Sequence, residues 1–188
     1  MFDFLQEFSG DNDQINAAKL ITQKPVVVMS GRGGCGKTFV VSNVLSKALE
    51  MKKLVPQEFA GDLDNENVST SDAERDKASK TRQEEIEEQV LITAPTGKAA
   101  SILGRRTSLP SHTLHSVIYS CTFWEQAGGQ GDWKFNKVRL LVCDECSMIS
   151  VRVFSKLLSC LTKWTQLQQV ILLGDVDQLP SIDRKSVV

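Results

Sequence analysis

A glycine-rich octapeptide at residues 31–38, GRGGCGKT, follows the apolar run at residues 25–29. A strand that leads into G-x-x-x-x-G-K-[ST] is typical of the phosphate loop of nucleoside triphosphatases. Glycines allow backbone conformations in which successive N–H groups point at one anion. Lys37 would place its charge on the β- and γ-phosphates, and Thr38 would offer a hydroxyl to Mg²⁺. A helix beginning near Gly36 would direct its positive end at the same phosphates.

The expected ligand of this loop is therefore ATP with Mg²⁺. The residues predicted to contact the nucleotide are Gly31, Gly33, Gly34, Cys35, Gly36, Lys37, Thr38 and Phe39. The alternative is a glycine-rich turn that binds nothing, and the order of strand, loop and helix argues against it.

A second apolar segment, at residues 138–143, ends in Asp144 and Glu145. A carboxylate at the tip of a buried parallel strand can hold the Mg²⁺ that Thr38 also binds. The adjacent Glu145 is placed to orient or deprotonate a water molecule. We therefore expect Asp144 to be a metal ligand and Glu145 a catalytic base. The alternative for an Asp-Glu pair is a solvated turn.

Gln178 lies beyond another apolar segment, at residues 170–173. From there its side chain could reach the γ-phosphate or the attacking water, and we expect it to join Lys37 and Glu145 as a catalytic residue. It could also report the state of the nucleotide to a nucleic-acid site. The alternative is an ordinary loop glutamine.

Apolar and polar segments alternate in an order that would bring these residues to one edge of a sheet. The predicted strands are residues 25–30, 89–93, 138–143 and 169–173, and the predicted helices are residues 12–22, 36–51, 96–103 and 151–161. Alternating strands and helices imply an α/β fold, with a parallel sheet, flanking helices and right-handed crossovers. Ligands of such sheets bind beyond the carboxyl ends of the strands, where the phosphate loop and Asp144 are predicted.

The composition is that of one globular domain of 188 residues. No apolar run approaches the ~20 residues that cross a bilayer, and the N-terminus lacks the features of a secretory signal. We therefore expect no membrane partner. The five scattered cysteines favour reduced thiols and an intracellular location. Cys143 and Cys146 form a C-x-x-C pair only because they flank the acidic pair, so we expect neither a zinc nor a redox site.

Charge is distributed unevenly along the chain. Residues 54–90 carry 11 acidic and 4 basic side chains, whereas the rest of the chain carries 12 acidic and 18 basic ones. A basic body suits a polyanionic ligand such as a nucleic acid, which the acidic segment would repel. We expect residues 54–88 to form an acidic insert, disordered over about residues 55–81. This insert is either a solvated loop or a docking site for a basic groove on a partner.

Five motifs occur in a fixed order: GRGGCGKT, TAPTGKAA, T-L-H at residues 113–115, VCDECSM and GDVDQLPS. As a set they resemble the first motor domain of superfamily 1 DNA helicases, and the second and third resemble the RecD-like, 5′-to-3′ branch. Within that branch, the phosphate loop and the acidic insert look most like the eukaryotic helicase B group. The resemblance implies a RecA-like domain over residues 1–188. It also implies ATP hydrolysis coupled to translocation on single-stranded DNA, with duplex unwinding in replication and repair in the nucleus.

The same resemblance assigns roles to further residues. Gln14 matches a glutamine that reads adenine, and its alternative is a solvated helix residue. The residues that match motifs touching the single strand are Thr96, Gly97, Lys98, Thr113 and His115. A helix N-terminus with a hydroxyl and a lysine is a plausible phosphate site in its own right. The alternative for the histidine is a capping or packed residue.

Two inserts are also interpreted from the resemblance. Residues 117–136 match a small arm or pin that helps to split the duplex, and its aromatic residues are Tyr119, Phe123, Trp124 and Trp133. They could stack on bases, but we expect at least two of them to pack onto the motor domain. The acidic insert corresponds to a segment that engages the single-stranded-DNA-binding protein, which with other replication proteins is the expected partner.

A motor of this type needs a second motor domain, which supplies arginines to the γ-phosphate. Beyond Gln178 the only arginine is Arg184, and it matches no finger motif. We therefore expect the second motor domain to be absent and the 188-residue polypeptide to be a half-motor. Such a polypeptide would bind MgATP weakly, hydrolyse it very slowly and unwind nothing alone. The alternatives are a non-motor module that binds nucleotide, single strands or a partner, and a small-molecule kinase, against which the second and fifth motifs argue.

Overall fold

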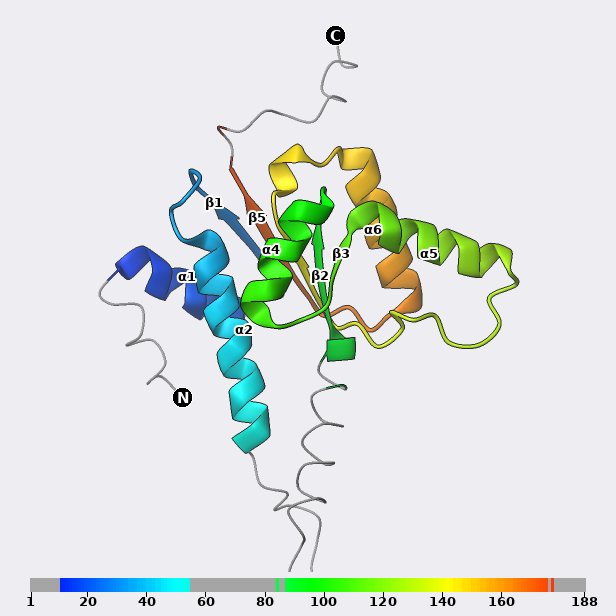
Figure 1. Cartoon of the computed structure of the whole chain (residues 1–188), viewed down its shortest axis with the longest axis horizontal. Coiled ribbons are helices and arrows are strands. Elements are labelled where there is room, and N and C mark those ends of the chain that lie inside the picture. Colours follow the sequence, from blue (N-terminus) through cyan, green and yellow to red (C-terminus); the bar gives the residue numbers. More distant parts are fainter. Residues whose placement is uncertain (1–10, 55–83, 85–86, 176, 178–188) are drawn as a thin grey trace, which may run out of the picture.

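The computed structural model describes residues 11–54, 84, 87–175 and 177 (Figure 1). In chain order the elements are α1 (Asn12–Gln23), β1 (Val26–Ser30), α2 (Lys37–Leu54), β2 (Val90–Ala94), α4 (Gly97–Thr107), β3 (Ser111–Thr113), α5 (Leu114–Gln126), β4 (Leu140–Cys143), η2 (Cys146–Met148), α6 (Val151–Trp164) and β5 (Gln169–Gly174). Every strand and helix predicted from the apolar pattern is present, with ends shifted by a few residues.

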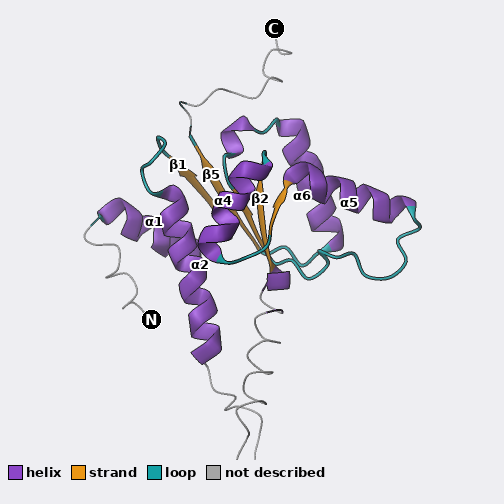
Figure 2. Ribbon diagram, viewed as in Figure 1, coloured by secondary structure: helices purple, strands orange, loops and turns teal. Residues whose placement is uncertain are grey.

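The five strands form one parallel sheet in the order β1-β5-β4-β2-β3 (Figure 2). This arrangement confirms the predicted α/β fold with a parallel sheet and flanking helices. Because every strand runs in the same direction, the loops that follow β1, β4 and β5 all lie at one edge of the sheet. The phosphate loop follows β1, and Asp144 and Asp175 follow β4 and β5, so the fold brings these segments together.

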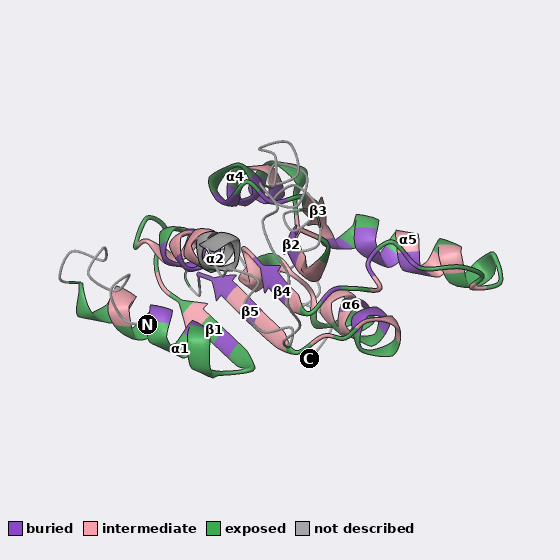
Figure 3. Ribbon diagram, turned by 90° about the horizontal axis from the view of Figure 1, so that it is seen from below, coloured by how far each residue is buried: buried purple, intermediate pink, exposed green. Residues whose placement is uncertain are grey.

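Two hydrophobic clusters lie on the two faces of the sheet, because neighbouring residues of a strand point to opposite faces. In β4, Val142 joins the cluster of α1, α2 and α4, whereas Leu141 joins the cluster of α5 and α6. Ile171 and Leu172 of β5 divide in the same way. Figure 3 shows α2 and α4 on one side of the sheet and α6 on the other. Strands covered on both faces read as continuous apolar runs, which is why the sequence predicts them well.

Side-chain caps fix the ends of the helices that carry site residues. The carboxylate of Asp11 accepts hydrogen bonds from the backbone N–H groups of the first turn of α1. Thr96 caps α4, which continues past the predicted end at residue 103 to Thr107. Ser108 then ends α4 in the left-handed conformation, with a φ of 56°.

The region after β3 differs most from the sequence prediction. The predicted arm at residues 117–136 consists of the larger part of α5 and the loop that follows it. Trp133 is buried and donates a hydrogen bond from Nε1 to Ser120 Oγ at 3.0 Å, and Trp124 packs edge-on against Trp164. The expectation that at least two of the aromatic residues pack onto the domain is thus confirmed. Tyr119 and Phe123, in contrast, are exposed.

Almost all of the acidic insert, at residues 54–88, lies outside the described residues, and its predicted disorder and docking role stay predictions. Within the described residues, no helix is both long and apolar enough to span a bilayer.

Candidate functional site

The phosphate loop joins β1 to α2 and is held against the end of β5. The backbone N–H of Gly31 donates to the carbonyl oxygen of Gly174 at 3.2 Å. Gly34 and Gly36 have φ values of 82° and 90°, which side chains strongly disfavour. A Cβ at Gly36 would also lie 2.9 Å from Nε2 of Gln14. The backbone conformation at this position therefore requires glycine, whereas the flexible end of Gln14 could move away from an added Cβ.

The ammonium group of Lys37 lies within the curve of the loop. It donates hydrogen bonds to the carbonyl oxygens of Gly31 and Arg32, the latter at 3.0 Å, and lies 3.7 Å from Sγ of Cys35. An ammonium group has three donors and no acceptor, so it can exchange carbonyl partners for phosphate oxygens without losing its hydrogen bonds. This position is compatible with the predicted phosphate-binding role of Lys37.

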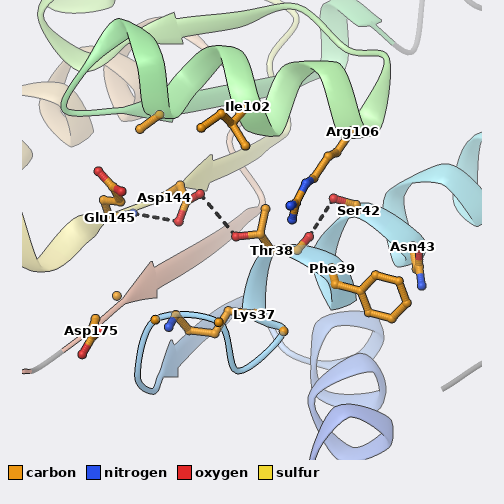
Figure 4. Close-up of a pocket in the computed structure, with 15 residues that line it drawn as sticks. Lys37, Thr38, Phe39, Ser42, Asn43, Ile102, Arg106, Asp144, Glu145 and Asp175 are labelled. Atoms are coloured by element: carbon orange, nitrogen blue, oxygen red, sulfur yellow. Dashed lines mark hydrogen bonds between the residues drawn. The ribbon is translucent and has the colours of Figure 1, made fainter. Parts of the chain in front are cut away.

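Thr38 and Asp144 meet, although 106 residues separate them in the sequence. The hydroxyl of Thr38 donates to Oδ2 of Asp144 at 3.5 Å, and the backbone N–H of Glu145 donates to Oδ1 at 2.9 Å. All three residues line one cavity of about 700 Å³ together with Lys37 (Figure 4). The two segments singled out from the sequence therefore converge on one site.

Burial raises the pKa of Asp144. The N–H of Glu145, the positive charge of Lys37, the hydroxyl of Thr38 and the charge of Arg106 oppose this effect without cancelling it. A half-buried carboxylate with too little positive charge around it favours a cation. The carboxylate and hydroxyl oxygens of Asp144 and Thr38 are the hard ligands that Mg²⁺ prefers, so this pair fits the expected metal.

Glu145 adopts a strained backbone conformation, with φ 50° and ψ 38°. Left-handed conformations are uncommon outside glycine, and they occur disproportionately at functional sites. The residue lies between β4 and η2, as the N-cap residue of η2. This geometry adds a structural reason to consider Glu145 functional.

Several residues that line the cavity are not among the site residues predicted from the sequence, including Asp175, Arg106 and Asn43. Asp175, which follows β5, is 6% exposed, and its Oδ1 accepts a hydrogen bond from the N–H of Asp177 at 3.0 Å. Its position after a buried strand is the signal that could have identified it. Arg106 of α4 and Asn43 of α2 also line the cavity. Polar helix residues of these types are usually solvated, and the sequence alone gives no reason to select them.

The remaining predicted nucleotide-binding residues are placed as follows. Gln14 lies against the phosphate loop and lines an adjoining cavity of about 510 Å³, together with Cys35. It is therefore not simply a solvated helix residue, and its role toward adenine stays a prediction. Phe39 lines the main cavity and is partly exposed. Gln178 lies outside the described residues.

The predicted nucleic-acid residues lie at the ends of two neighbouring strands. Thr96 follows β2 and Thr113 ends β3, and each hydroxyl accepts a hydrogen bond from a helix N–H at 3.2 Å. Both threonines thus cap helices, and each hydroxyl keeps a hydrogen that can be donated to a phosphate. Lys98 and His115 are exposed in the first turns of α4 and α5. The histidine is thus not a packed residue.

Comparisons with known proteins agree with this geometry. A family model described as "AAA domain" matches residues 14–184. The chain is 40% identical to mouse DNA helicase B over 175 residues, which is 92% of this chain and 16% of that protein. It is 25% identical over 194 residues to RecBCD enzyme subunit RecD of Mycobacterium tuberculosis, covering 96% of this chain and 28% of that protein. It is 34% identical over 100 residues to the ATP-dependent RecD2 DNA helicase of Deinococcus radiodurans, covering 50% of this chain and 12% of that protein.

The chain therefore spans less than a third of each of these relatives. The matches confirm the resemblance to RecD-like superfamily 1 helicases that the motifs carry.

Proposed function

The chain belongs to the AAA domain family, and from this premise we propose that it is the ATP-binding motor domain of a DNA helicase. In this proposal the whole protein couples ATP hydrolysis to translocation on single-stranded DNA and to duplex unwinding, in replication and repair in the nucleus. The observation that carries the proposal is the convergence of Lys37, Thr38 and Asp144 on one cavity.

The residues of the proposed mechanism have distinct tasks. Lys37 and the N–H groups of the loop bind the β- and γ-phosphates. Thr38 and Asp144 would hold Mg²⁺, which neutralises charge on the phosphate oxygens when it is bound. Glu145, at the strained turn, orients a water molecule and accepts its proton. Gln178 is proposed to position the same water or the γ-phosphate.

The 188-residue polypeptide is proposed to turn over slowly by itself. Arginines that a second domain supplies across the nucleotide cleft accelerate phosphoryl transfer by about 10³- to 10⁵-fold. Among the described residues, Arg106 lines the nucleotide cavity together with residues of the phosphate loop. Arg32 belongs to the loop itself, and its Nε pairs with Asp177 at 3.2 Å.

The second candidate function is a module that binds nucleotide and single strands without turnover.

One pair of polypeptides separates these functions. The first is the 188-residue chain, and the second is the same chain joined to the region of mouse DNA helicase B that follows the matched segment. If the chain is a motor domain, both polypeptides should bind MgATP, and Lys37→Ala should abolish this binding in both. Single-stranded DNA should stimulate ATP hydrolysis only in the longer polypeptide. A longer polypeptide that binds nucleotide but never hydrolyses it would favour the binding module. Efficient duplex unwinding by the 188-residue chain would contradict the half-motor.

The acidic insert is proposed to bind the single-stranded-DNA-binding protein. Support comes from its charge, since 11 acidic side chains suit a basic groove. Reversing the charge of Glu84, Glu85, Glu87 and Glu88 should abolish partner binding and leave ATP binding unchanged, as measured by calorimetry. Because Glu88 also pairs with Lys137 at 2.8 Å, Lys137→Gln is the matched control. Undiminished partner affinity in the charge-reversed protein would refute the proposal.

A further inference from the structure

Helix α4 turns one face toward the nucleotide cavity. The residues on that face are Ala99, Ile102 and Arg106, at the i, i+3 and i+7 spacing of a helix stripe. Arg106 extends from this stripe toward the first turns of α2, and Figure 4 shows its guanidinium directed at Thr38 and Ser42. The phosphate loop and Lys37 border the cavity on the other side of Thr38 (Figure 4).

No direct contact with a described residue accounts for the direction of this side chain, although its positive charge acts on Asp144. Arg106 is exposed, and within the described part of the chain its guanidinium makes no hydrogen bond or ion pair. The adjacent Arg105 is also exposed but does not line the cavity. The two arginines are therefore neighbours in one helix turn, but only Arg106 faces the cavity.

The charges of the cavity suggest the partner of Arg106. Its carboxylates, on Asp144, Glu145 and Asp175, gather at the carboxyl ends of β4 and β5, whereas Arg106 and Lys37 reach in from α4 and the loop. A guanidinium offers donors in a planar fork that matches two phosphate oxygens at once. A triphosphate seated between the loop and α4 would place oxygens within its reach.

We propose that Arg106 is a further phosphate-binding residue, which contacts the triphosphate from α4 while Lys37 contacts it from the loop. The inference rests on the proposed function, because it needs a nucleoside triphosphate in this cavity. It adds a residue that belongs to none of the five motifs. The arginine acts from within this chain, so it is distinct from arginines supplied by a second domain.

The test measures binding of a fluorescent ATP analogue with Mg²⁺ to the 188-residue chain and its variants. Arg106→Ala should weaken binding about 5- to 20-fold, the size expected for loss of a charge-assisted hydrogen-bonded pair. Arg106→Lys should recover part of the affinity. Arg105→Ala, the matched control, should stay within about 2-fold, since it removes an equal charge one residue away. Because Arg106 is exposed, the unfolding temperatures of all variants should agree.

A second arm separates a phosphate contact from an effect transmitted through Asp144. The same titrations in EDTA should keep the loss in Arg106→Ala, because a direct phosphate contact does not need the metal. A loss seen only with Mg²⁺ would mean that the arginine acts through Asp144, and it would overturn the inference.

The remaining outcomes distinguish this inference from the proposed function. Normal affinity in Arg106→Ala, with binding abolished in Lys37→Ala, would refute the inference and leave the proposed function intact. Equal binding by the wild-type chain and Lys37→Ala would overturn both.

Discussion

Asp144 illustrates how a residue suited to chemistry can be unfavourable for folding. Its carboxylate is half-buried at the end of β4, and burial raises its pKa despite a hydrogen bond from the next N–H. The folded protein therefore binds a proton at this site more readily than the unfolded chain does. Its contribution to the free energy of unfolding is unfavourable at neutral pH and becomes less so as the pH falls through the raised pKa.

Asp144→Asn should therefore be at least as stable as the wild type at pH 7 without nucleotide. An asparagine oxygen can accept the same N–H of Glu145, and its neutral side chain removes the buried charge. The stability difference should shrink as the pH is lowered through the raised pKa, because the wild-type carboxyl then becomes neutral too. Binding of nucleotide with Mg²⁺ should weaken about 10-fold or more through loss of a charged metal ligand. Urea unfolding at several pH values and calorimetry measure both effects; a clearly less stable variant at pH 7 would contradict this account.

Glu145→Gln tests the proposed base without changing the size of the side chain. Hydrolysis should fall about 10²- to 10⁴-fold, since glutamine cannot accept the proton of water. Nucleotide affinity should change little, because Asp144 and Thr38 hold the metal side of the site. Steady-state hydrolysis by the longer polypeptide, beside nucleotide titration of the same variant, gives both numbers. If Glu145→Gln retained hydrolysis, a group other than Glu145 would have to accept the proton of the water molecule.

At the scale of elements, the position of α4 depends on a close approach to the chain that follows it. A Cβ at Gly104 would lie 2.5 Å from Oγ of Ser111 and 3.0 Å from the carbonyl oxygen of Leu109. A Cβ at Gly97, at the other end of the helix, would meet nothing within 4 Å. Packing therefore requires glycine at residue 104 but not at residue 97.

Gly104→Ala should lower the free energy of unfolding by about 1–3 kcal/mol, because the added methyl group must displace β3 or the loop before it. Gly97→Ala, its control, should be neutral or stabilising by up to about 1 kcal/mol, since alanine restricts the unfolded chain. Denaturant unfolding of both variants provides the comparison. Equal stabilities would show that α4 can move away from β3 without cost.

The elements that the sequence predicted well are those whose local apolar pattern directly reflects their position in the fold. Strands β2, β4 and β5 are buried on both faces, so their apolar runs are unambiguous. β3 has three residues and α5 mixes apolar, aromatic and hydroxyl side chains, and neither gives a clear period. Their placement follows from packing against α4 and α6, which a local pattern does not contain.

Some residues of the candidate site could likewise be predicted from the sequence, and others could not. The phosphate loop and Asp144 could be found because backbone chemistry fixes their residue types and spacing. Arg106 could not be found, because its role depends on how far α4 continues and which way its third turn faces. Sequence reasoning placed the end of that helix at residue 103, whereas α4 ends at Thr107.

At the scale of the whole molecule, charge is separated between the acidic segment and the rest of the chain. Replacing residues 54–88 with a neutral Gly/Ser linker of equal length should strengthen binding of single-stranded DNA about 2- to 5-fold at low salt. The difference should vanish near 0.5 M salt, where the screening length is only a few ångströms. Fluorescence anisotropy with a labelled oligonucleotide at several salt concentrations measures it. Unchanged affinity at low salt would show that the segment lies too far from the DNA site to influence it.

Helix α4 begins at Gly97, next to its cap Thr96, both of them predicted to contact the DNA strand, and carries Arg106 near its other end, at the nucleotide cavity. An α-helix of 11 residues behaves as a short rigid rod of about 16 Å. In the proposed function, this rod would join the DNA contact at one end to the phosphate contact at the other, without a relay of side chains between them. A tilt of α4 would then change the contact with the DNA strand and the contact with the triphosphate at the same moment.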